Sequence, residues 1–341
     1  MCPILFNSCL GAITRGDFPA GRRLVEELFD LARGDDDPGF KLQAHHAAWD
    51  VLLAAGELRE AERHIEAGFS LYRRESHGWH ARAYGGHDPG VCCHILEACR
   101  QAILGYPDLA VGQMTNGLAL ARDLTHPPTL AHSLTLAAEL RQVRCEPLAV
   151  EEIITELVPL VSQYGSPVRI AHAAMLRGWA RTAQGKDDGL VQLQGGLVSW
   201  RATGSMFNAP YRLAVAADAY RMAGIVQEGL HLVTEAMQVA TRTGFRMIEA
   251  ELHRLHGELA LRSNDQNTAE ICFKQAIAIA RAQSARLFEL RAATRLSHHW
   301  RDQGRKVEAL DLLAPIYGWF SEGFDTIDLK DAKALLDELS A

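Results

Sequence analysis

The chain has 341 residues, of which 48% are hydrophobic and 7% aromatic, and it carries a formal net charge of −7. Its basic residues are scattered without a Lys/Arg cluster, which argues against nucleic acid as a main partner. No apolar run reaches the roughly 18 residues that a membrane span requires, so we expect no membrane partner. The seven cysteines lack paired spacing, which is typical of free thiols in a reducing cytoplasm.

A repeated unit divides the chain. Its clearest copy is GELREA at 56–61, where a helix breaker is followed five residues later by a small residue and then by an apolar helical stripe. Strong and weak copies together place the breaker at Gly16, Gly56, Gly105, Arg144, Gly185, Gly224, Asn264 and Gly304. Their spacing is about 40 residues, and a fixed period of this size is the signature of a solenoid.

Each repeat is predicted to be two antiparallel helices, A and B, that meet at the breaker. Glycine ends helix A because it adopts left-handed backbone angles without a Cβ penalty, and the small residue lets helix B cross close to helix A. In chain order, helix A of the eight repeats is expected to start near residues 2, 42, 91, 126, 167, 210, 249 and 290.

One step between repeats, from 56 to 105, is about nine residues longer than the others. The surplus falls at 76–90, SHGWHARAYGGHDPG, which is too rich in Gly, His and Pro for a helix interior. We predict an inserted loop at one rim of the groove. Asp88 is expected to cap the next helix. The rim residues are His80, Tyr84, His87 and Asp88.

The predicted fold is therefore all-α, a right-handed superhelical solenoid of about eight helix pairs that spans 1–341 as a single domain. A polar helix at 326–340 is expected to cap the last repeat. The chain starts within a repeat, which suggests either a longer parent chain or a partner that covers this end.

The pattern resembles tetratricopeptide repeats, although the period exceeds their usual 34 residues. YGGHDPGVCCH at 84–94 and LLAPIYGWFSEGFDTIDLKDAKALL at 312–336 are similar to the C-terminal repeat region of bacterial multidomain nucleotide cyclases and predicted ATPases, and LRGWA at 176–180 fits the same region. The chain has no phosphate-binding GxxxxGK[ST] and no cyclase domain, so neither activity carries over. The resemblance implies a partner-binding or sensing module, once linked to a cyclase or ATPase domain or standing alone.

In a tetratricopeptide solenoid the A helices line the concave face. Counting the breaker as position fifteen, positions two, five, nine and twelve should face the groove. The groove-facing set predicted in this way is His46, Asp50, Cys92, His172, Met175, Trp179, Tyr211, Asp218, Arg221, Arg254, Glu258, Arg291, His298 and Arg301.

The arginines of the C-terminal half, such as Arg254 and Arg291, could hold an acidic peptide, because guanidinium groups pair with carboxylates in bidentate fashion. The nearby Glu251 and Glu258 favour internal ion pairs equally. A plain solvated face is a further alternative for the whole polar set.

His87, Asp88, Cys92, Cys93 and His94 lie within eight residues and could ligate zinc, but their spacing is not CxxC and no second half-site is evident. We therefore expect no metal and no cofactor. Cys92 with His46 as a thiol nucleophile and base would be an enzyme site, which no motif supports.

The function expected from the sequence is a non-catalytic, cytoplasmic scaffold that binds a protein or peptide in its concave groove, in bacterial signalling or regulation. The alternative is a small-ligand sensor that transmits binding through a change in superhelix curvature, and an enzyme with a His/Cys site comes third. A compact pocket near His46, Cys92 and His172 would favour the sensor, and an open groove would favour the scaffold.

Overall fold

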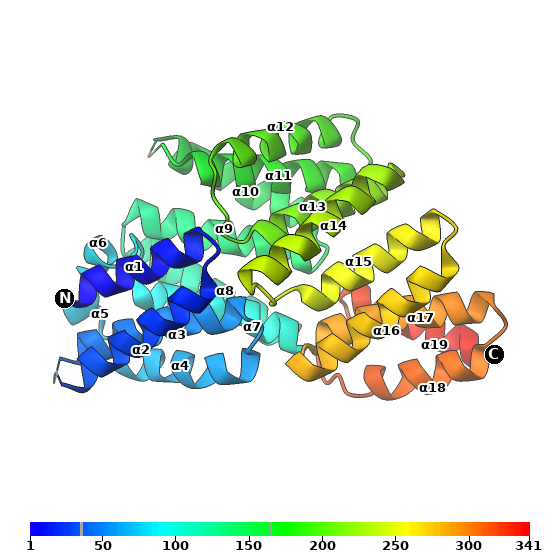
Figure 1. The fold of residues 1–341 in the computed structure, drawn as a ribbon, viewed down its shortest axis with the longest axis horizontal. Coiled ribbons are helices and arrows are strands. Elements are labelled where there is room, and N and C mark those ends of the chain that lie inside the picture. Colours follow the sequence, from blue (N-terminus) through cyan, green and yellow to red (C-terminus); the bar gives the residue numbers. More distant parts are fainter. Residues whose placement is uncertain (35–36, 164) are drawn as a thin grey trace.

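The computed structural model describes residues 1–34, 37–163 and 165–341, and the secondary structure of this part of the chain is entirely helical. Sixteen helices form eight antiparallel pairs that follow one another along a coil, with the two termini at opposite ends of its long axis (Figure 1). The pairs are α1 (Cys2–Thr14) with α2 (Phe18–Arg33), α3 (Pro38–Ala54) with α4 (Leu58–Leu71), α7 (Pro89–Leu104) with α8 (Pro107–Asp123), α9 (Pro127–Val143) with α10 (Pro147–Gln163), α11 (Pro167–Ala183) with α12 (Gly189–Ala202), α13 (Ala209–Met222) with α14 (Val226–Thr243), α15 (Glu249–Arg262) with α16 (Gln266–Gln283), and α17 (Arg286–Asp302) with α18 (Lys306–Tyr317).

A final helix, α19 (Ile327–Ser340), covers the last pair. The prediction of an all-α solenoid of eight helix pairs with a C-terminal capping helix is confirmed. No helix in the described residues is long and apolar enough to span a membrane.

The predicted breakers are the tight turns between the A and B helices. Gly56 and Gly105 have φ values of +75° and +97°, in the left-handed region that glycine tolerates best. In the fourth repeat the breaker lies one residue later than predicted, because Cys145, with φ of +56°, takes the left-handed position and Arg144 does not. With this correction the steps on both sides of the fourth breaker are 40 residues.

The helix crossing after two breakers also differs from the prediction. Val150 is fully buried at the crossing of the fourth repeat, whereas the predicted Ala149 is only partly buried. In the fifth repeat the close approach falls on Gly189, where an added Cβ would lie 2.4 Å from the backbone nitrogen of Thr182, and Leu190 lies beside it. A small residue thus lies at the crossing of the fifth repeat, one position earlier than predicted, whereas the fourth repeat has the larger Val150 there.

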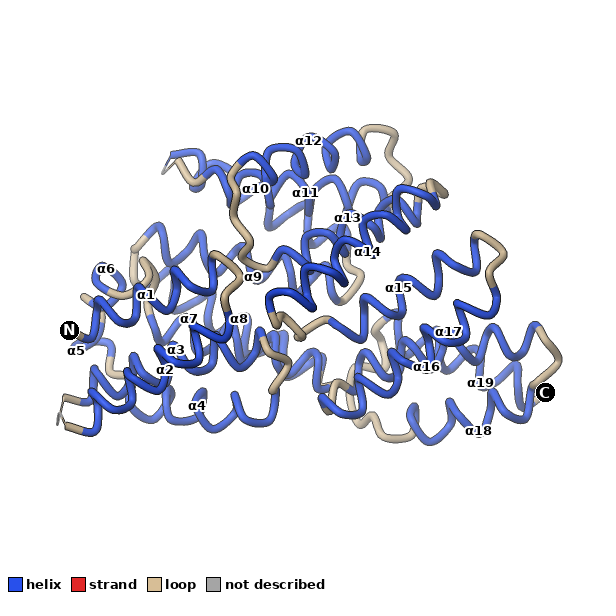
Figure 2. Tube along the Cα trace, in the orientation of Figure 1, coloured by secondary structure: helices blue, strands red, loops and turns tan. Residues whose placement is uncertain are grey.

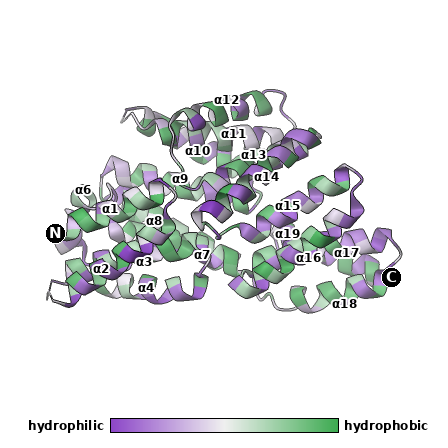
Figure 3. Ribbon diagram, in the orientation of Figure 1, coloured by the Kyte–Doolittle hydropathy of each residue, from purple (hydrophilic) through white to green (hydrophobic). Residues whose placement is uncertain are grey.

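The B helices bury one face, and the A helices bury most of theirs. In α4 the buried residues Leu58, Ala61, Ile65 and Gly68 follow helical spacing, while α3 buries twelve of its 17 residues. Hydrophobic and hydrophilic residues accordingly alternate around the outer helices in Figure 3. The A helices are sandwiched between their own B helix and the neighbouring pairs, and so their remaining polar side chains gather on the inner side.

The inserted segment is more ordered than the predicted loop. It forms two single-turn helices, α5 (Arg74–His77) and α6 (His80–Ala83), before Asp88 begins α7. As predicted, the Asp88 carboxylate accepts a hydrogen bond from the backbone N–H of Val91 at 3.0 Å and caps α7. Trp79 of the segment is 54% exposed.

Later repeats of the superhelix also pack against the first ones, so that loops far apart in the sequence are in contact. The backbone N–H of Met206 donates to the carbonyl of Thr14 at 3.0 Å, and that of Arg246 donates to the carbonyl of Ala54 at 2.7 Å. Both bonds join an A–B turn of one repeat to the segment that precedes helix A five repeats later. Figure 2 shows these turns as tan segments between the helices.

A third contact of this kind involves the segment before α19. The Glu322 carboxylate accepts from the backbone N–H of Asp108 at 2.8 Å, and the Asp108 carboxylate accepts from the N–H of Gly323 at 3.0 Å. These bonds hold the C-terminal segment against the start of α8. The last three repeats and the capping helix therefore pack against the first four repeats.

Candidate functional site

A pocket of about 890 Å³, including the part open to solvent, lies between the A helices α13, α15 and α17. The turn from α9 to α10 and the first turns of α19 complete its wall, so it forms where the coil returns on itself. Apolar side chains, including Ala214, Ile248, Leu255 and Phe288, make up part of the lining. The hydroxyl of Tyr211 at its edge donates to Gln142 Oε1 at 2.8 Å.

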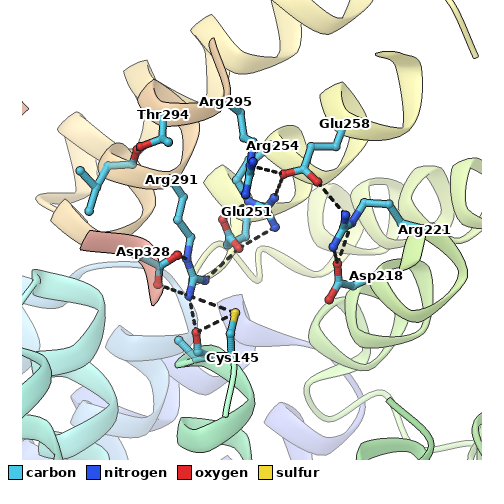
Figure 4. A network of polar contacts seen from close by, with 12 residues as sticks. Cys145, Asp218, Arg221, Glu251, Arg254, Glu258, Arg291, Thr294, Arg295 and Asp328 are labelled. Atoms are coloured by element: carbon cyan, nitrogen blue, oxygen red, sulfur yellow. Dashed lines mark hydrogen bonds and ion pairs between the residues drawn. The ribbon is translucent and has the colours of Figure 1, made fainter. Parts of the chain in front are cut away.

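Guanidinium and carboxylate groups alternate across this pocket (Figure 4). Arg221 contacts Asp218 Oδ1 at 2.8 Å and Glu258 Oε2 at 3.1 Å. Arg254 pairs with the other oxygen of Glu258 and donates from Nε to Glu251 Oε1 at 2.6 Å. Arg221, Arg254 and Glu258 thus each have at least two partners of opposite sign.

Arg291 continues the chain of ion pairs to the capping helix. Its Nη1 donates to Glu251 Oε2 at 3.2 Å, and its Nε and Nη2 donate to the two oxygens of Asp328, each at 2.8 Å. The same Nη2 donates to the carbonyl of Val143, at the end of α9. One side chain therefore joins α15, α17 and α19 to a turn four repeats earlier.

Arg295 lies at the mouth of the pocket, where its side chain is 44% exposed. Its contacts are Glu258 Oε1 at 3.0 Å and Asp331 Oδ2 at 3.2 Å. A second hollow shares Arg221, Glu258 and Arg295 with the pocket and extends to His298 near the end of α17. The two together form an elongated depression along the inner side of α15 and α17.

The arginines keep the Glu258 carboxylate of the pocket ionised. Burial alone would raise the pKa of Glu258, but Arg254, Arg221 and Arg295 lower it to about 2. Burial likewise opposes the charge of Arg254, but Glu251 and Glu258 raise its pKa above the usual value. Four arginines face five carboxylates in the lining, so the pocket has no surplus of positive charge.

Six of the predicted groove residues line this pocket: Tyr211, Asp218, Arg221, Arg254, Glu258 and Arg291. Trp179 lies beside it, where its indole N–H donates to Asp218 Oδ2 at 2.8 Å. The internal ion pairs of the second interpretation are present, because Arg221, Arg254 and Arg291 each contact two acidic residues, and binding of an acidic peptide stays a prediction.

Other predicted groove residues are placed differently. His172 is buried and bonds Glu139 Oε1 at 2.8 Å, between α11 and α9. Met175 is fully buried because Gly196 of α12 lets the helices approach and leaves its side chain in the core. His298 and Arg301 contact Asp331 and Glu338 of α19 and so help to attach the capping helix.

The rim predicted at the inserted segment does not present its side chains outward. Tyr84 and Asp88 are fully buried, and His80 and His87 nearly so. Their burial follows from α1 and α3, since Tyr84 packs edge-on against Phe6 with ring centroids 5.5 Å apart. The four predicted rim residues are thus part of the core, whereas Trp79 and Arg82 of the same segment are exposed.

His46, His87 and Cys92 are also buried, and their potential ligand atoms lie within 4.8 Å of one another. The thiol of Cys92 does not have the character of a nucleophile, because burial first and Asp50 second raise its pKa well above the usual value. The pocket described above does not include His46, Cys92 or His172, the residues at which a compact pocket was expected to favour a sensor.

Sequence reasoning missed the part of the pocket that comes from outside the A helices of repeats six to eight, and also Arg295 of α17 at the mouth. These residues belong to the turn after α9, to the mouth and to α19. A repeat period predicts which residues share a helix face, but it contains no signal for contacts between successive turns of the coil. The missed residues are Gln142, Val143, Cys145, Arg295, Asp328 and Asp331.

No family model matches the sequence. An uncharacterized protein of Rhizobium meliloti (strain 1021) is 24% identical over 294 residues, which are 86% of this chain and 28% of that protein. Intraflagellar transport protein 70A of Bos taurus is 26% identical over 187 residues, or 50% of this chain and 27% of that protein. The chain thus spans little more than a quarter of the length of these relatives.

Among solved structures, a Rap protein complexed with competence and sporulation factor aligns with 99% of this chain and 96% of its own, with a TM-score of 0.63 and 10% identity. A signal transduction ATPase with a tetratricopeptide repeat sensor from Pyrococcus horikoshii aligns with 94% of this chain and 54% of its own, with a TM-score of 0.44 and 14% identity. The alignment with the Rap protein shows that the fold is of the tetratricopeptide-repeat type.

Proposed function

We propose that residues 1–341 form a single solenoid domain that acts as a non-catalytic scaffold and binds an extended peptide segment of a partner protein in the pocket between α13, α15 and α17. The observation that carries this proposal is the alternation of guanidinium and carboxylate groups along an elongated depression. The proposal requires no cofactor.

An extended peptide presents carbonyl oxygens and N–H groups in alternation. Arginines such as Arg221 and Arg295 can donate to the carbonyls, and carboxylates such as Glu258 can accept from the N–H groups, both as charge-assisted hydrogen bonds. The apolar part of the lining, including Leu255 and Phe288, would receive a hydrophobic side chain. Because the lining has no surplus of positive charge, we expect no general preference for acidic peptides.

A small-ligand sensor is the second candidate, and the contacts of Arg291 favour it specifically. This side chain joins Glu251 and Asp328 of the pocket to Val143 of an earlier repeat. A ligand that competes for its guanidinium would loosen this connection and change the curvature of the coil. The Rap protein of similar fold is complexed with competence and sporulation factor, which agrees with ligand binding by a coil of this kind.

We further propose that the module works in the bacterial cytoplasm, in signalling or regulation, and that it is related to modules attached to cyclase or ATPase domains. The support is the resemblance of 84–94 and 312–336 to such repeat regions, together with the greater length of the Rhizobium relative. Neither a nucleic acid nor a membrane is part of the proposal.

Peptide selection on the full chain tests the scaffold function. Ala214, part of the pocket wall and partly buried, is replaced by Trp to fill the pocket without touching an ion pair. Ala119, exposed in the middle of α8, is replaced by Trp as the matched control. We expect peptides that bind the wild type and Ala119→Trp but not Ala214→Trp.

Peptides that bind all three proteins equally would contradict the pocket as the site. Selection of no peptide, combined with a thermal shift by a small metabolite that Ala214→Trp abolishes, would favour the sensor. In either case the circular dichroism spectra of the two variants must match that of the wild type, so that loss of binding is not loss of fold.

A further inference from the structure

A buried cluster of donor atoms lies far from the pocket, where α3, the inserted segment and α7 meet. His46 Nε2 lies 3.1 Å from His87 Nε2, and both atoms lie within 4.8 Å of Cys92 Sγ. His46 and Cys92 are about 1% exposed or less, and His87 is 6% exposed. This cluster has no role in the proposed peptide binding, and the sequence alone did not predict that it would form.

The hydrogen bonds on the far side of each imidazole indicate which nitrogen carries the proton. His46 Nδ1 lies 3.0 Å from Gln43 Oε1, and His87 Nδ1 lies 3.2 Å from the carbonyl oxygen of Gly85. Both oxygens are acceptors, so each Nδ1 carries the hydrogen and each Nε2 is left with a bare lone pair. Two lone pairs 3.1 Å apart repel each other unless a cation lies between them.

A carboxylate lies beside this cluster. Asp50 Oδ2 lies 3.9 Å from His46 Nε2, one helical turn along α3, and His46 is its one ion-pairing partner in the described part of the chain. A bound divalent cation would place a positive charge beside this carboxylate.

We propose that His46, His87 and Cys92, with Asp50 as the fourth ligand, form a structural Zn²⁺ site that joins the second repeat to the third across the inserted segment. Two imidazoles, a thiolate and a carboxylate are ligands that zinc accepts in a tetrahedral site. The negative charges of Cys92 and Asp50 balance the charge of the ion.

The geometry fits this assignment. Zinc–nitrogen bonds of about 2.0–2.1 Å at tetrahedral angles place two ligand nitrogens about 3.3 Å apart, close to the distance between the two Nε2 atoms. Gln43 and Gly85 are the outer-shell acceptors that orient the rings, an arrangement typical of metal-bound histidines. The His87 ring also stacks on His132, with centroids 4.1 Å apart, which holds it in place.

The site accounts for the insertion between the second and third repeats. The extra residues bring His87 to the N-terminus of α7, close to His46 of α3 and to Cys92 one turn further on. Zinc would then hold the segment 76–88 against α3 and α7, so that Trp79 and its neighbours keep a fixed position on the surface.

Cobalt titration of the full chain tests the proposal. The protein is dialysed against a chelator under reducing conditions and titrated with Co²⁺ alone, with Zn²⁺ as competitor. We expect one Co²⁺ per chain, visible bands of tetrahedral intensity and a thiolate charge-transfer band in the near ultraviolet, all removed by one equivalent of Zn²⁺. Cys92→Ser should lose the charge-transfer band, and Gln43→Leu should weaken binding by about 10- to 100-fold.

Cys93→Ser is the matched control, because Cys93 is the next residue, is equally buried and donates its thiol hydrogen to the carbonyl of Ile65. It should retain the full spectrum. If the wild type takes up no stoichiometric Co²⁺ or Zn²⁺, the proposal is wrong, and His46 and His87 share a hydrogen bond instead. A charge-transfer band that persists in folded Cys92→Ser would also overturn it. Should Cys92→Ser not fold, the wild-type stoichiometry alone decides.

Discussion

Arg291 of α17 donates two hydrogen bonds, each 2.8 Å long, to the two carboxylate oxygens of Asp328 in α19. The same guanidinium contacts Glu251 in α15 and the carbonyl of Val143 at the end of α9. A bidentate pair of this kind fixes the relative orientation of its partners as well as their distance. The pocket wall therefore depends on one arginine that joins four separate helices.

Replacing Arg291 with Met should destabilise the protein strongly. The change leaves Asp328 and Glu251, both 15% exposed, with one cationic partner fewer, and loss of one member of a largely buried ion pair costs about 3 kcal/mol or more. Urea unfolding at pH 7 measures the effect. Arg295→Met is the control, since Arg295 is 44% exposed and should contribute about 1 kcal/mol or less. Equal losses for the two variants would show that Arg291 has no special role.

Acid should weaken the pocket between about pH 4.5 and pH 2. The arginines around Glu258 lower its pKa from 4.5 to about 2 although burial opposes them, so the folded state keeps this carboxylate charged when the unfolded state has already bound a proton. The contribution of about 3 kcal/mol is thus complete above pH 4.5 and is lost as the pH falls through 2. Urea unfolding over this range should show a shallower pH dependence for Glu258→Gln than for the wild type.

Glu66→Gln, at an exposed position of α4, is the matched control and should leave the slope unchanged. If Glu258→Gln has the same slope as the wild type, the ion pairs of the pocket do not hold the Glu258 carboxylate in its charged form.

A second loss of stability is expected at milder acidity. Burial, and then the neighbouring His64, lower the pKa of His45 from 6.5 to about 4, so the unfolded chain binds a proton in this range and the folded chain does not. Stability from His45 is therefore present above pH 6.5 and falls by about 2 kcal/mol toward pH 4, given its partial exposure. His45→Gln should flatten the stability profile between pH 6.5 and 4, whereas His231→Gln, at an exposed site, should not.

Two glycines of the fifth repeat should respond in opposite ways to alanine. A Cβ at Gly178 would lie 2.4 Å from the backbone nitrogen of Leu193, so Gly178→Ala must separate α11 from α12 and should cost about 2 kcal/mol or more. Gly195, exposed in α12, has open space at the same position, and Gly195→Ala should stabilise by about 0.5–1 kcal/mol. Thermal unfolding measures both. Similar changes in melting temperature would contradict the close crossing of these helices.

The repeat architecture was predictable because one local rule recurs. A residue with left-handed backbone angles ends each A helix, and a glycine such as Gly56 or Gly105 indicates this position in the sequence. The same rule failed by one residue at Cys145, where the left-handed conformation falls on a residue type that gives no such signal. The order within 76–90 was missed because its two short helices depend on packing against α1 and α3 and not on local propensity.

The pocket was predictable only in part, because helical periodicity describes local structure and not contacts between distant repeats. Helical periodicity placed Arg221, Arg254 and Arg291 on one face, and the structure brings them together. It could not show that Arg291 reaches Val143, 148 residues earlier, because that contact arises when the coil returns on itself. Nor could it show that His46 and His87 meet, since the inserted segment separates them in the sequence.

Hydrogen–deuterium exchange of the full chain, with and without a selected peptide, tests the central claim most directly. If the peptide lies along the ion pairs of the pocket, the backbone amides of α13, α15 and α17 should exchange more slowly in the complex, while those of α14, α16 and α18 on the outer side remain unchanged. Protection confined to the outer helices, or to the region of α3 and α7, would contradict the account.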